Sequence, residues 1–277
     1  IIRQVIDSEA LWRDYVFGKQ TIFQLSERYG ISQSTVRRRL DKVGVPRIIS
    51  SSKNVVVLMD TTYWGRNFGV VVFKDWRTKR VLWRKFVRYE TLSDYREGIA
   101  WLEAHEFKID GIVCDGLRGM FQQLSRYKVQ MCQYHQLRIV QRYLTRSPEL
   151  PASIELLSIA KLLSCTDKES FIGAFEAWRR RWDTFLKERT RDSRTGKSRY
   201  VHKRLRSAYL SLKRNMPHLW TWYDHIEIGI PNTNNALEGM FTGLKTKLRN
   251  HPGLSKKHRK KFIDEYFREP FKFFRGD

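Results

Sequence analysis

Three acidic residues lie where neighbouring apolar residues would hold a carboxylate in place. Asp60 ends a continuous apolar run, Asp115 ends a second short apolar segment, and Glu238 lies near the start of a third. Three carboxylates with few competing ligands suit the hard cations Mg²⁺ and Mn²⁺, which prefer oxygen ligands. Two such ions about 3.5–4 Å apart can activate a water or a 3′-hydroxyl and stabilise the leaving oxygen of a phosphoryl displacement. The residue types therefore predict metal-dependent chemistry on a phosphodiester.

Each of these residues also has an ordinary structural interpretation. An Asp at the end of a strand is often a turn or helix-cap residue, and a Glu among cations often belongs to a solvated helix face. The combination favours a site, because two strand-end aspartates are followed by a glutamate on a basic helix in a chain of formal charge +24.

Glu238 belongs to a helix that is predicted to begin after an Asn- and Thr-rich segment. Pro231 ends the preceding segment, and Asn234 and Asn235 are expected to cap the helix and to face the same catalytic edge. Apolar residues then recur at helical spacing, so one face of the helix packs on a core.

Two cations follow Glu238 along the same face of this helix. At 100° per residue, Lys245 and Arg249 fall within about 20° of Glu238. They are predicted to contact DNA.

Strands and helices are predicted along residues 54–145 in an order that would bring the two aspartates together. The expected strands are 54–60, 68–73, 81–87, 109–115 and 129–132, and the expected helices are 91–105, 117–127 and 135–145. Three strands joined by short turns form a meander, and later strands that return through helices lie parallel. The first and fourth strands would then be neighbours about 4.8 Å apart, so that Asp60 and Asp115 share cations at their C-terminal ends.

The character of the sequence changes after residue 148. As far as about residue 225, strand signals are absent and apolar residues recur at helical spacing, with one polar break at 189–197. This predicts an all-helical insertion before the Glu238 helix. Trp178, Trp182, Trp220 and Trp222 are expected mostly in its core, with stacking on an unpaired base as the alternative. A last helix is expected over residues 256–267.

Residues 8–45 carry a helix-turn-helix pattern. Helices are expected over 8–17, 21–29 and 33–43, with Gly30 supplying the left-handed conformation of the turn. The exposed face of the third helix offers side chains that contact phosphates and base edges, namely Gln33, Ser34, Arg37, Arg38 and Arg39. We expect this unit to bind DNA, and a protein-interaction module is the alternative.

The composition indicates the same kind of partner. The chain has 277 residues, and its 53 Lys and Arg against 29 Asp and Glu are spread along the whole length. Such a surface suits nucleic acid, with an anionic membrane as the rival, but no apolar stretch is long enough to span a bilayer and no signal peptide is visible. Three cysteines agree with a reducing cytoplasm, where a nucleoid-associated location is expected. Because the chain begins at Ile1 and not at Met, we expect further residues before it.

The motifs around the three acids resemble a known family. Asp60 lies in Leu-Met-Asp-Thr-Thr-Tyr, Asp115 in Val-Cys-Asp-Gly, and Glu238 in Asn-Thr-Asn-Asn-Ala-Leu-Glu-Gly. A Cys-Gln-Tyr-His motif and the helical insertion lie between the second aspartate and the glutamate. Over residues 53–275 this combination resembles the DDE transposases with an RNase H-like catalytic core, of the Mutator-like group of bacterial insertion sequences.

The resemblance implies an α/β fold. It would contain an RNase H-like mixed sheet with helices on both faces, interrupted by the all-helical insertion and preceded by the helix-turn-helix. The expected domains are 1–48 (helix-turn-helix), 53–147 (first part of the catalytic core), 148–226 (insertion) and 227–277 (C-terminal part of the core). Asp60, Asp115 and Glu238 would be the catalytic triad that binds two Mg²⁺ or Mn²⁺ ions. The partners would be double-stranded DNA at transposon ends and target sites, and a second copy of the chain on DNA, with no membrane.

Cys132 and His135, the ends of the Cys-Gln-Tyr-His motif, could also be read as zinc ligands. A structural zinc site needs four ligands, and no second pair has suitable spacing. Cys114 and Cys165 are lone residues, which are more often buried than ligating. We therefore expect no zinc, and we expect the pair to support the active-site edge or to contact DNA, as the resemblance implies.

A transposase that cuts and joins DNA at the element ends is the leading hypothesis. A nuclease or Holliday-junction resolvase on the same fold would cut without joining. A DNA-binding regulator with a degenerate core would bind without cutting, although three intact carboxylates argue against it.

Overall fold

A computed structural model of the chain describes residues 6–44, 53–191 and 193–268. Of the predicted domains, residues 1–5, 45–48, 192 and 269–277 lie outside the described residues. The chain divides into two compact units. The first unit consists of Ile1–Lys53, Thr61–Phe107 and Ala236–Asp277, and the second unit consists of Asn54–Asp60 and Lys108–Asn235.

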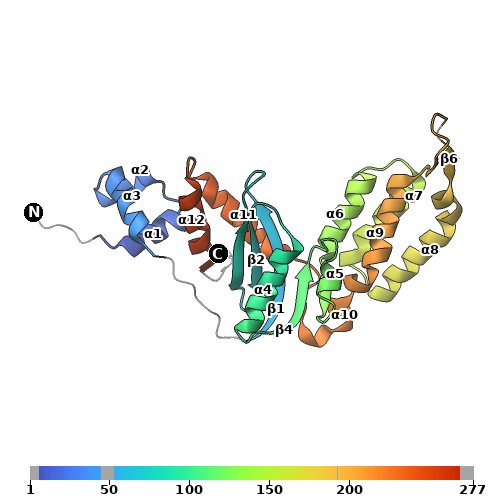
Figure 1. The fold of residues 1–277 in the computed structure, drawn as a ribbon, viewed down its shortest axis with the longest axis horizontal. Helices are drawn as coiled ribbons and strands as arrows, with labels where there is room; N and C mark the ends of the chain where they lie inside the picture. The colour runs from blue at the N-terminus through green and yellow to red at the C-terminus, as the bar shows by residue number, and fades with distance from the viewer. Residues whose placement is uncertain (1–5, 45–52, 192, 269–277) are drawn as a thin grey trace, which may run out of the picture. The chain divides into compact units, whose positions relative to one another are not determined.

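Five strands of the described residues form one mixed sheet, in the order β3-β2-β1-β4-β5 (Figure 1). They are β1 (Asn54–Tyr63), β2 (Gly69–Asp75), β3 (Val81–Val87), β4 (Lys108–Cys114) and β5 (Val129–Met131). β2 and β3 are antiparallel, whereas β4 is parallel to both β1 and β5. The predicted mixed α/β class and the parallel neighbourhood of the first and fourth strands are confirmed.

β1 is longer than predicted, so Asp60 lies inside the strand and not at its end. Residues 61–63 are β-branched or aromatic and continue the extended backbone, as such residues favour. The Trp64 N–H then donates to the Phe68 carbonyl over 2.8 Å and closes the turn into β2. The parallel pairing of β1 with β4, by contrast, ends at the residue pair Leu58 and Val113.

In the first unit, α4 (Leu92–Ala104) packs on β2 and β3. Thr91 begins this helix with a capping box, in which its side chain and that of Asp94 each bond the other's backbone N–H. Phe73 lies between the rings of Trp83 and Tyr95, at centroid distances of 5.0 and 6.0 Å. A Cβ at Gly98 would lie only 2.6 Å from the Phe73 ring, so a glycine permits this close approach.

The helix-turn-helix of the first unit forms as predicted. Its helices are α1 (Ser8–Val16), α2 (Ile22–Tyr29) and α3 (Gln33–Lys42). Thr21 and Ser32 accept backbone N–H groups as N-caps of the second and third helices, and Gly30 takes the left-handed conformation at φ 60°. Leu11, Leu25 and Val36 are fully buried between the helices.

Two helices near the C-terminus, α11 (Asn235–Arg249) and α12 (Lys256–Arg268), support the helix-turn-helix. The His251 and Tyr15 rings lie 4.3 Å apart. The Lys247 ammonium donates to the Phe17 carbonyl over 2.7 Å, and the His258 ring lies 2.7 Å from the Asp41 carboxylate. Segments at opposite ends of the sequence therefore pack together within the first unit.

The second unit is mainly a helical bundle. Its helices are α5 (Met120–Gln123), α6 (Gln133–Leu144), α7 (Pro151–Lys161), α8 (Lys168–Lys187), α9 (Lys203–Leu219) and α10 (Thr221–Asp224), with 3-10 turns at Leu162–Ser164 and Ile226–Ile228. The four long helices α6 to α9 lie side by side (Figure 1). Trp178 and Trp220 are buried in the bundle and Trp182 and Trp222 pack partly buried against it, which confirms their predicted core position.

Three local predictions in the second unit are wrong. The insertion is not all-helical, because the polar break forms a hairpin of β6 (Arg189–Arg191) and β7 (Ser198–Tyr200). α5 is much shorter than the predicted 117–127, since Gly116 and Gly119 take left-handed conformations before it. α6 begins at Gln133, with Cys132 as its N-cap, and so starts earlier than His135.

Candidate active site

Asp60 and Asp115 lie next to each other in the second unit. Leu58 and Val113 are register partners on the parallel strands β1 and β4, and the two aspartates follow two residues later. Asp60 continues β1, and Asp115 directly follows the last residue of β4, Cys114. Burial raises the pKa of the Cys114 thiol well above its usual range, and the nearby charges of Asp115 and Asp60 raise it further. The structure therefore brings together the two acids that the sequence singled out.

The Asp115 carboxylate has capacity for a further ligand. Its Oδ1 is buried, and none of the described residues hydrogen-bonds it. Gly116, at φ +78°, turns the chain directly after the aspartate, in a conformation that L side chains rarely adopt. A buried carboxylate oxygen without a partner is costly, and a cation would satisfy it. Asp60, at 9% exposure, is similarly enclosed.

The chain before the Glu238 helix is fixed to the same edge of the second unit. The Asn234 side-chain amide donates to the Met59 carbonyl over 3.0 Å, and its backbone N–H donates to Cys132 Sγ over 3.2 Å. Asn232 exchanges two hydrogen bonds of 3.0 Å with Gln133. These contacts place the 232–234 segment beside the residue that precedes Asp60.

Asn234 does not cap the helix, contrary to the prediction. A cap would accept a backbone N–H with Oδ1, but Oδ1 has no hydrogen-bond partner among the described residues, and the amide nitrogen is committed to Met59. The tertiary hydrogen bond to β1 takes the place of the local one. Asn235 is the first residue of α11 and is exposed.

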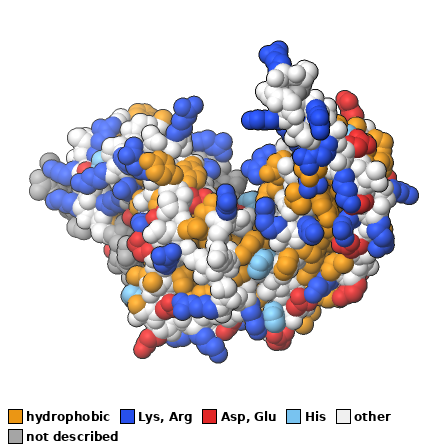
Figure 2. Space-filling view, turned by 45° about the vertical axis from the view of Figure 1, so that its right-hand side comes forward, with side chains coloured by type: hydrophobic (Ala, Val, Ile, Leu, Met, Phe, Trp, Pro, Cys, Tyr) orange, Lys and Arg blue, Asp and Glu red, His pale blue; other side chains and the backbone are white. Residues whose placement is uncertain are grey.

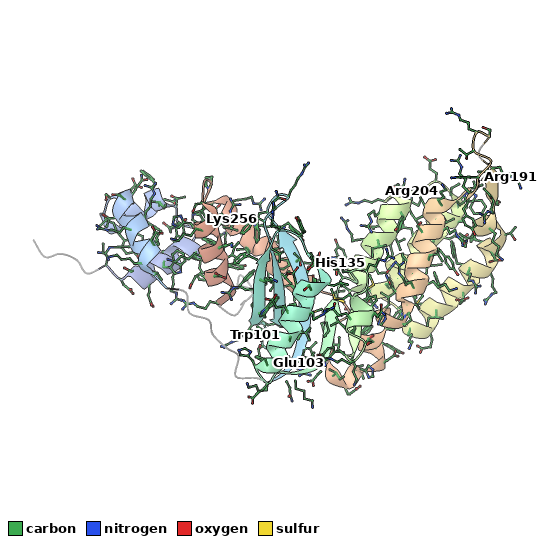
Figure 3. The ribbon with its side chains drawn as sticks, viewed as in Figure 1. Trp101, Glu103, His135, Arg191, Arg204 and Lys256 are labelled. Atoms are coloured by element: carbon green, nitrogen blue, oxygen red, sulfur yellow. The ribbon has the colours of Figure 1, made fainter. Side chains whose placement is uncertain are left out.

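Cys132 and His135 are brought to this edge from the start of α6. Cys132 is fully buried and accepts the Asn234 N–H, and its own N–H donates to the Cys114 carbonyl over 2.8 Å. His135 lies half-buried in the first turn of α6 (Figure 3). The two ends of the motif thus differ in position: the cysteine fixes backbone, and the histidine reaches a surface groove.

This groove, the α6 groove, runs within the second unit from Asp115 along α6. It has a volume of about 700 Å³. Its lining residues are Asp115, Gly116, Leu117, Arg118, His135, Arg138, Ile139, Gln141, Arg142, Thr145 and Arg146. Sequence reasoning missed its arginines, although Arg138, Arg142 and Arg146 recur every fourth residue after the Cys-Gln-Tyr-His motif. That spacing was the available signal.

Glu238 lies in the first turn of α11, half-buried, in the first unit. Both aspartates belong to the second unit, so Glu238 enters the site only by proposal. In the first unit, the Lys74 ammonium on β2 donates to the Ala236 carbonyl over 3.1 Å. Burial, together with the charge of Lys79, lowers the pKa of Lys74 to about 8. No pattern in the sequence predicts that this lysine is buried.

The predicted DNA contacts of the first unit are accessible, with one exception. Gln33, Ser34, Arg37 and Arg38 are all exposed on α3. The Arg39 guanidinium, in contrast, donates to the Ile6 carbonyl over 2.8 Å and is half-buried, so it stabilises the helix-turn-helix and leaves the exposed face to the others. This is the part of the prediction that is wrong.

The two cations behind Glu238 differ in exposure. Lys245 is half-buried, whereas Arg249 is exposed and donates to the Thr246 hydroxyl over 2.9 Å. Their contact with DNA stays a prediction.

No protein-family model matches this chain, and no curated protein matches it at a significant level. In the part of the chain that the structure describes, no helix is long and apolar enough to cross a membrane.

Proposed function

We propose that this chain is a DDE transposase with an RNase H-like core. It would bind the terminal inverted repeats of an insertion sequence, cut a DNA strand there and join the freed 3′ end to target DNA. The observation that carries the proposal is the pair of aspartates on neighbouring parallel strands, next to a groove lined by arginines. Paired carboxylates suit divalent cations, and arginines suit the phosphates on which such cations act.

The residues present fit divalent metal. Asp115 offers a buried carboxylate oxygen that no described residue hydrogen-bonds, and Asp60 lies on β1, the strand that pairs with β4 just before Asp115. Together with Glu238 they would hold two Mg²⁺ or Mn²⁺ ions, a set made only of oxygen ligands. When bound, such ions supply an activated water or 3′-hydroxyl and stabilise the leaving oxygen.

Glu238 is proposed as the third acid from its place in the sequence. Asn234 is tied to the carbonyl of Met59, the residue before Asp60, and α11 begins at the next residue, Asn235. Glu238 follows one helical turn later. This position in the sequence, one turn after a segment that is bonded to the residue before Asp60, is the reason for proposing Glu238.

The remaining side chains would bind and orient DNA. The exposed face of α3, with Gln33, Ser34, Arg37 and Arg38, would bind the terminal repeats, and Lys245 and Arg249 would hold phosphates near Glu238. Because two transposon ends must be paired, a homodimer is expected on DNA. A cytoplasmic, nucleoid-associated location follows from this role.

A cleavage assay tests the proposal. The substrate is a plasmid that carries the DNA flanking the gene, incubated with Mg²⁺ and purified protein. Asp60→Ala, Asp115→Ala and Glu238→Ala should each lower nicking by more than about 100-fold, because loss of a metal ligand costs at least as much as loss of a residue that supports one. Asp183→Ala is the matched control, since this acid is paired on the surface with Lys187.

The products distinguish the related functions. Strand-transfer products in addition to nicks support a transposase, whereas nicks without joined products indicate a nuclease or resolvase. Nicking that persists in Asp60→Ala or Glu238→Ala would show that the acids are misassigned. Binding with no metal-dependent cleavage in the unaltered protein would leave a DNA-binding regulator.

A further inference from the structure

The arginines of the α6 groove form a regular row. Arg138 and Arg142 are one helical turn apart on the exposed side of α6, and Arg146 follows after the helix ends at Leu144. Four residues of helix advance by about 6 Å, which covers roughly two nucleotides of a DNA strand at 3.4 Å each. Arg118 adds a fourth guanidinium close to Asp115 in sequence and in the groove lining. The groove therefore presents several guanidiniums, two of them at a spacing comparable with that of phosphates along a DNA strand.

Among the described residues, no carboxylate forms an ion pair with Arg118, Arg138, Arg142 or Arg146, and all four are exposed. Exposed arginines of α8 in the same unit are paired instead, Arg179 with Glu176 and Arg181 with Glu155. Asp115 is the one acid among the lining residues of the groove. Unpaired like charges repel one another, so a polyanion in the groove would relieve the repulsion.

The positive surface continues beyond the end of α6. The Arg204 guanidinium donates to the carbonyls of Tyr143 and Arg142 over 2.8 and 3.2 Å, which places its charge at the C-terminus of the helix. Thr145 lines both the α6 groove and a second hollow of about 500 Å³, lined in part by Lys203 and Arg204. His135, Arg204 and Arg191 mark this course from the start of α6 to the β6–β7 hairpin (Figure 3).

The hairpin at the end of this course is itself basic. Arg189, Arg191, Arg194, Lys197 and Arg199 all belong to it. Lys and Arg side chains crowd this projection and the surface beneath it in Figure 2.

We propose that the α6 groove binds the sugar–phosphate backbone of a single DNA strand and leads that strand to Asp115. The inference rests on the proposed function for its partner, and it names a surface of the second unit separate from the helix-turn-helix. Arg138 and Arg142 hold phosphates about two nucleotides apart, Arg146 holds a further phosphate beyond the end of α6, and His135 and Gln141 offer polar contacts between them. The arginines are positioning residues, because they bind DNA away from the reacting atoms.

Binding of a mixed-sequence single-stranded 20-mer in EDTA tests the groove. Without divalent ions no cleavage intervenes, and a single strand avoids the duplex-reading helix-turn-helix. In the triple variant Arg138→Gln, Arg142→Gln, Arg146→Gln, the slope of log K against log salt should become shallower by about 2, at about 0.7 per phosphate contact. The melting temperature should not change, because all three side chains are exposed.

Two further variants make the result specific. The triple variant Arg179→Gln, Arg180→Gln, Arg181→Gln removes the same charge from α8, outside the groove, and should leave the slope within about 0.5 of the original value. Lysines at 138, 142 and 146 should restore most of the slope. Equal loss in the two glutamine triples would overturn the proposal, since it would mean that binding reflects net charge alone.

The outcome is separable from that of the nicking assay. If Asp60→Ala leaves nicking intact but the groove variant still loses its salt slope, the strand-binding groove stands and the active-site assignment fails. If nicking follows the acids but the groove variant binds and cuts normally, the groove assignment fails. If both hold, the groove variant should raise the DNA concentration needed for half-maximal nicking about tenfold or more, with little change at saturation.

Discussion

Lys74 lies with its ammonium inside the first unit, where a lysine on a strand would normally reach water. It is 1% exposed, and its charge is met by the Ala236 carbonyl in the first turn of α11. Burial lowers its pKa from 10.5 to about 8. Between these two values the unfolded chain binds more protons at this residue than the folded chain does, so the contribution of Lys74 to the free energy of unfolding rises with pH across that window.

Replacing Lys74 should therefore change the pH dependence of stability. Lys74→Met keeps the length of the side chain and removes its titration. From pH 8 to 10 the free energy of unfolding of the unaltered protein should rise relative to that of the variant, by up to about 1.4 kcal/mol per pH unit. Urea unfolding of both proteins at pH 7, 8, 9 and 10 measures this difference, in which the other titrating groups cancel. Lys257→Met, at an exposed position on α12, should give a profile parallel to that of the unaltered protein. Parallel profiles for Lys74→Met would refute the assignment.

The residues of the candidate site were predictable to different degrees. Asp60 and Asp115 could be found because each follows an apolar run of the sequence, and the pairing of β1 with β4 then makes them neighbours. The role of Asn234 could not be found, because its partner is a backbone carbonyl 175 residues away. The charge state of Lys74 likewise depends on packing that a single strand does not encode.

At the scale of the elements, the 230–234 segment links two parts of the second unit. Ile230 packs closely against Gly111. A Cβ added to Gly111 would lie only 2.5 Å from Cδ1 of Ile230. Asn232 and Asn234 then bond the start of α6 and the end of the buried part of β1. These contacts fix residues 230–234 within the second unit.

Asn234 should be the most sensitive residue of this segment. Asn234→Ala removes the donor to the Met59 carbonyl and should lower the free energy of unfolding by about 1–3 kcal/mol. Asn234→Asp should cost more at pH 7, because an ionised carboxylate faces that carbonyl and cannot donate to it. The excess cost should shrink toward pH 4, where the acid regains a proton to donate. Urea unfolding at both pH values measures this, and equal costs of the two variants at pH 7 would contradict the proposed hydrogen bond. Asn235→Ala, at the exposed next position, should change stability by less than about 1 kcal/mol.

Elements whose apolar residues recur at a regular spacing were predicted close to their observed bounds. A hairpin without such a spacing was missed. The strand Val81–Val87 and the helix-turn-helix helices match their predicted limits closely, since apolar period and caps coincide. The β6–β7 hairpin was missed because its strands, Arg-Thr-Arg and Ser-Arg-Tyr, carry no apolar alternation. Its stability comes from cross-strand pairing and from Arg189 and Arg206 lying over the Tyr200 ring at 4.4 and 4.0 Å.

At the scale of the whole molecule, we propose that the basic residues behind the formal charge of +24 bind DNA in two different ways. The first unit carries the α3 side chains that would read the sequence of duplex DNA, and the second carries the α6 groove that would hold one strand. Base-edge contacts give sequence preference, whereas phosphate contacts give affinity that depends on salt. The two contributions should therefore respond to different substitutions.

Substitutions on α3, in the first unit, should separate the contribution of base-edge contacts from that of phosphate contacts. Gln33→Ala should reduce the preference for duplex DNA flanking the gene over an unrelated duplex of equal length by about 10-fold or more, because a base-edge contact contributes about 1–3 kcal/mol of discrimination. The double variant Arg37→Ala, Arg38→Ala should weaken binding to both duplexes equally and reduce the salt slope by about 2, at about 0.9 per phosphate. Arg28→Ala is the matched control, since this arginine on α2 is paired with Asp14. Fluorescence anisotropy between 50 and 200 mM salt measures both quantities. If Gln33→Ala weakens binding to the two duplexes equally, α3 does not read base edges, and if the arginine pair leaves the salt slope unchanged, it does not contact phosphates.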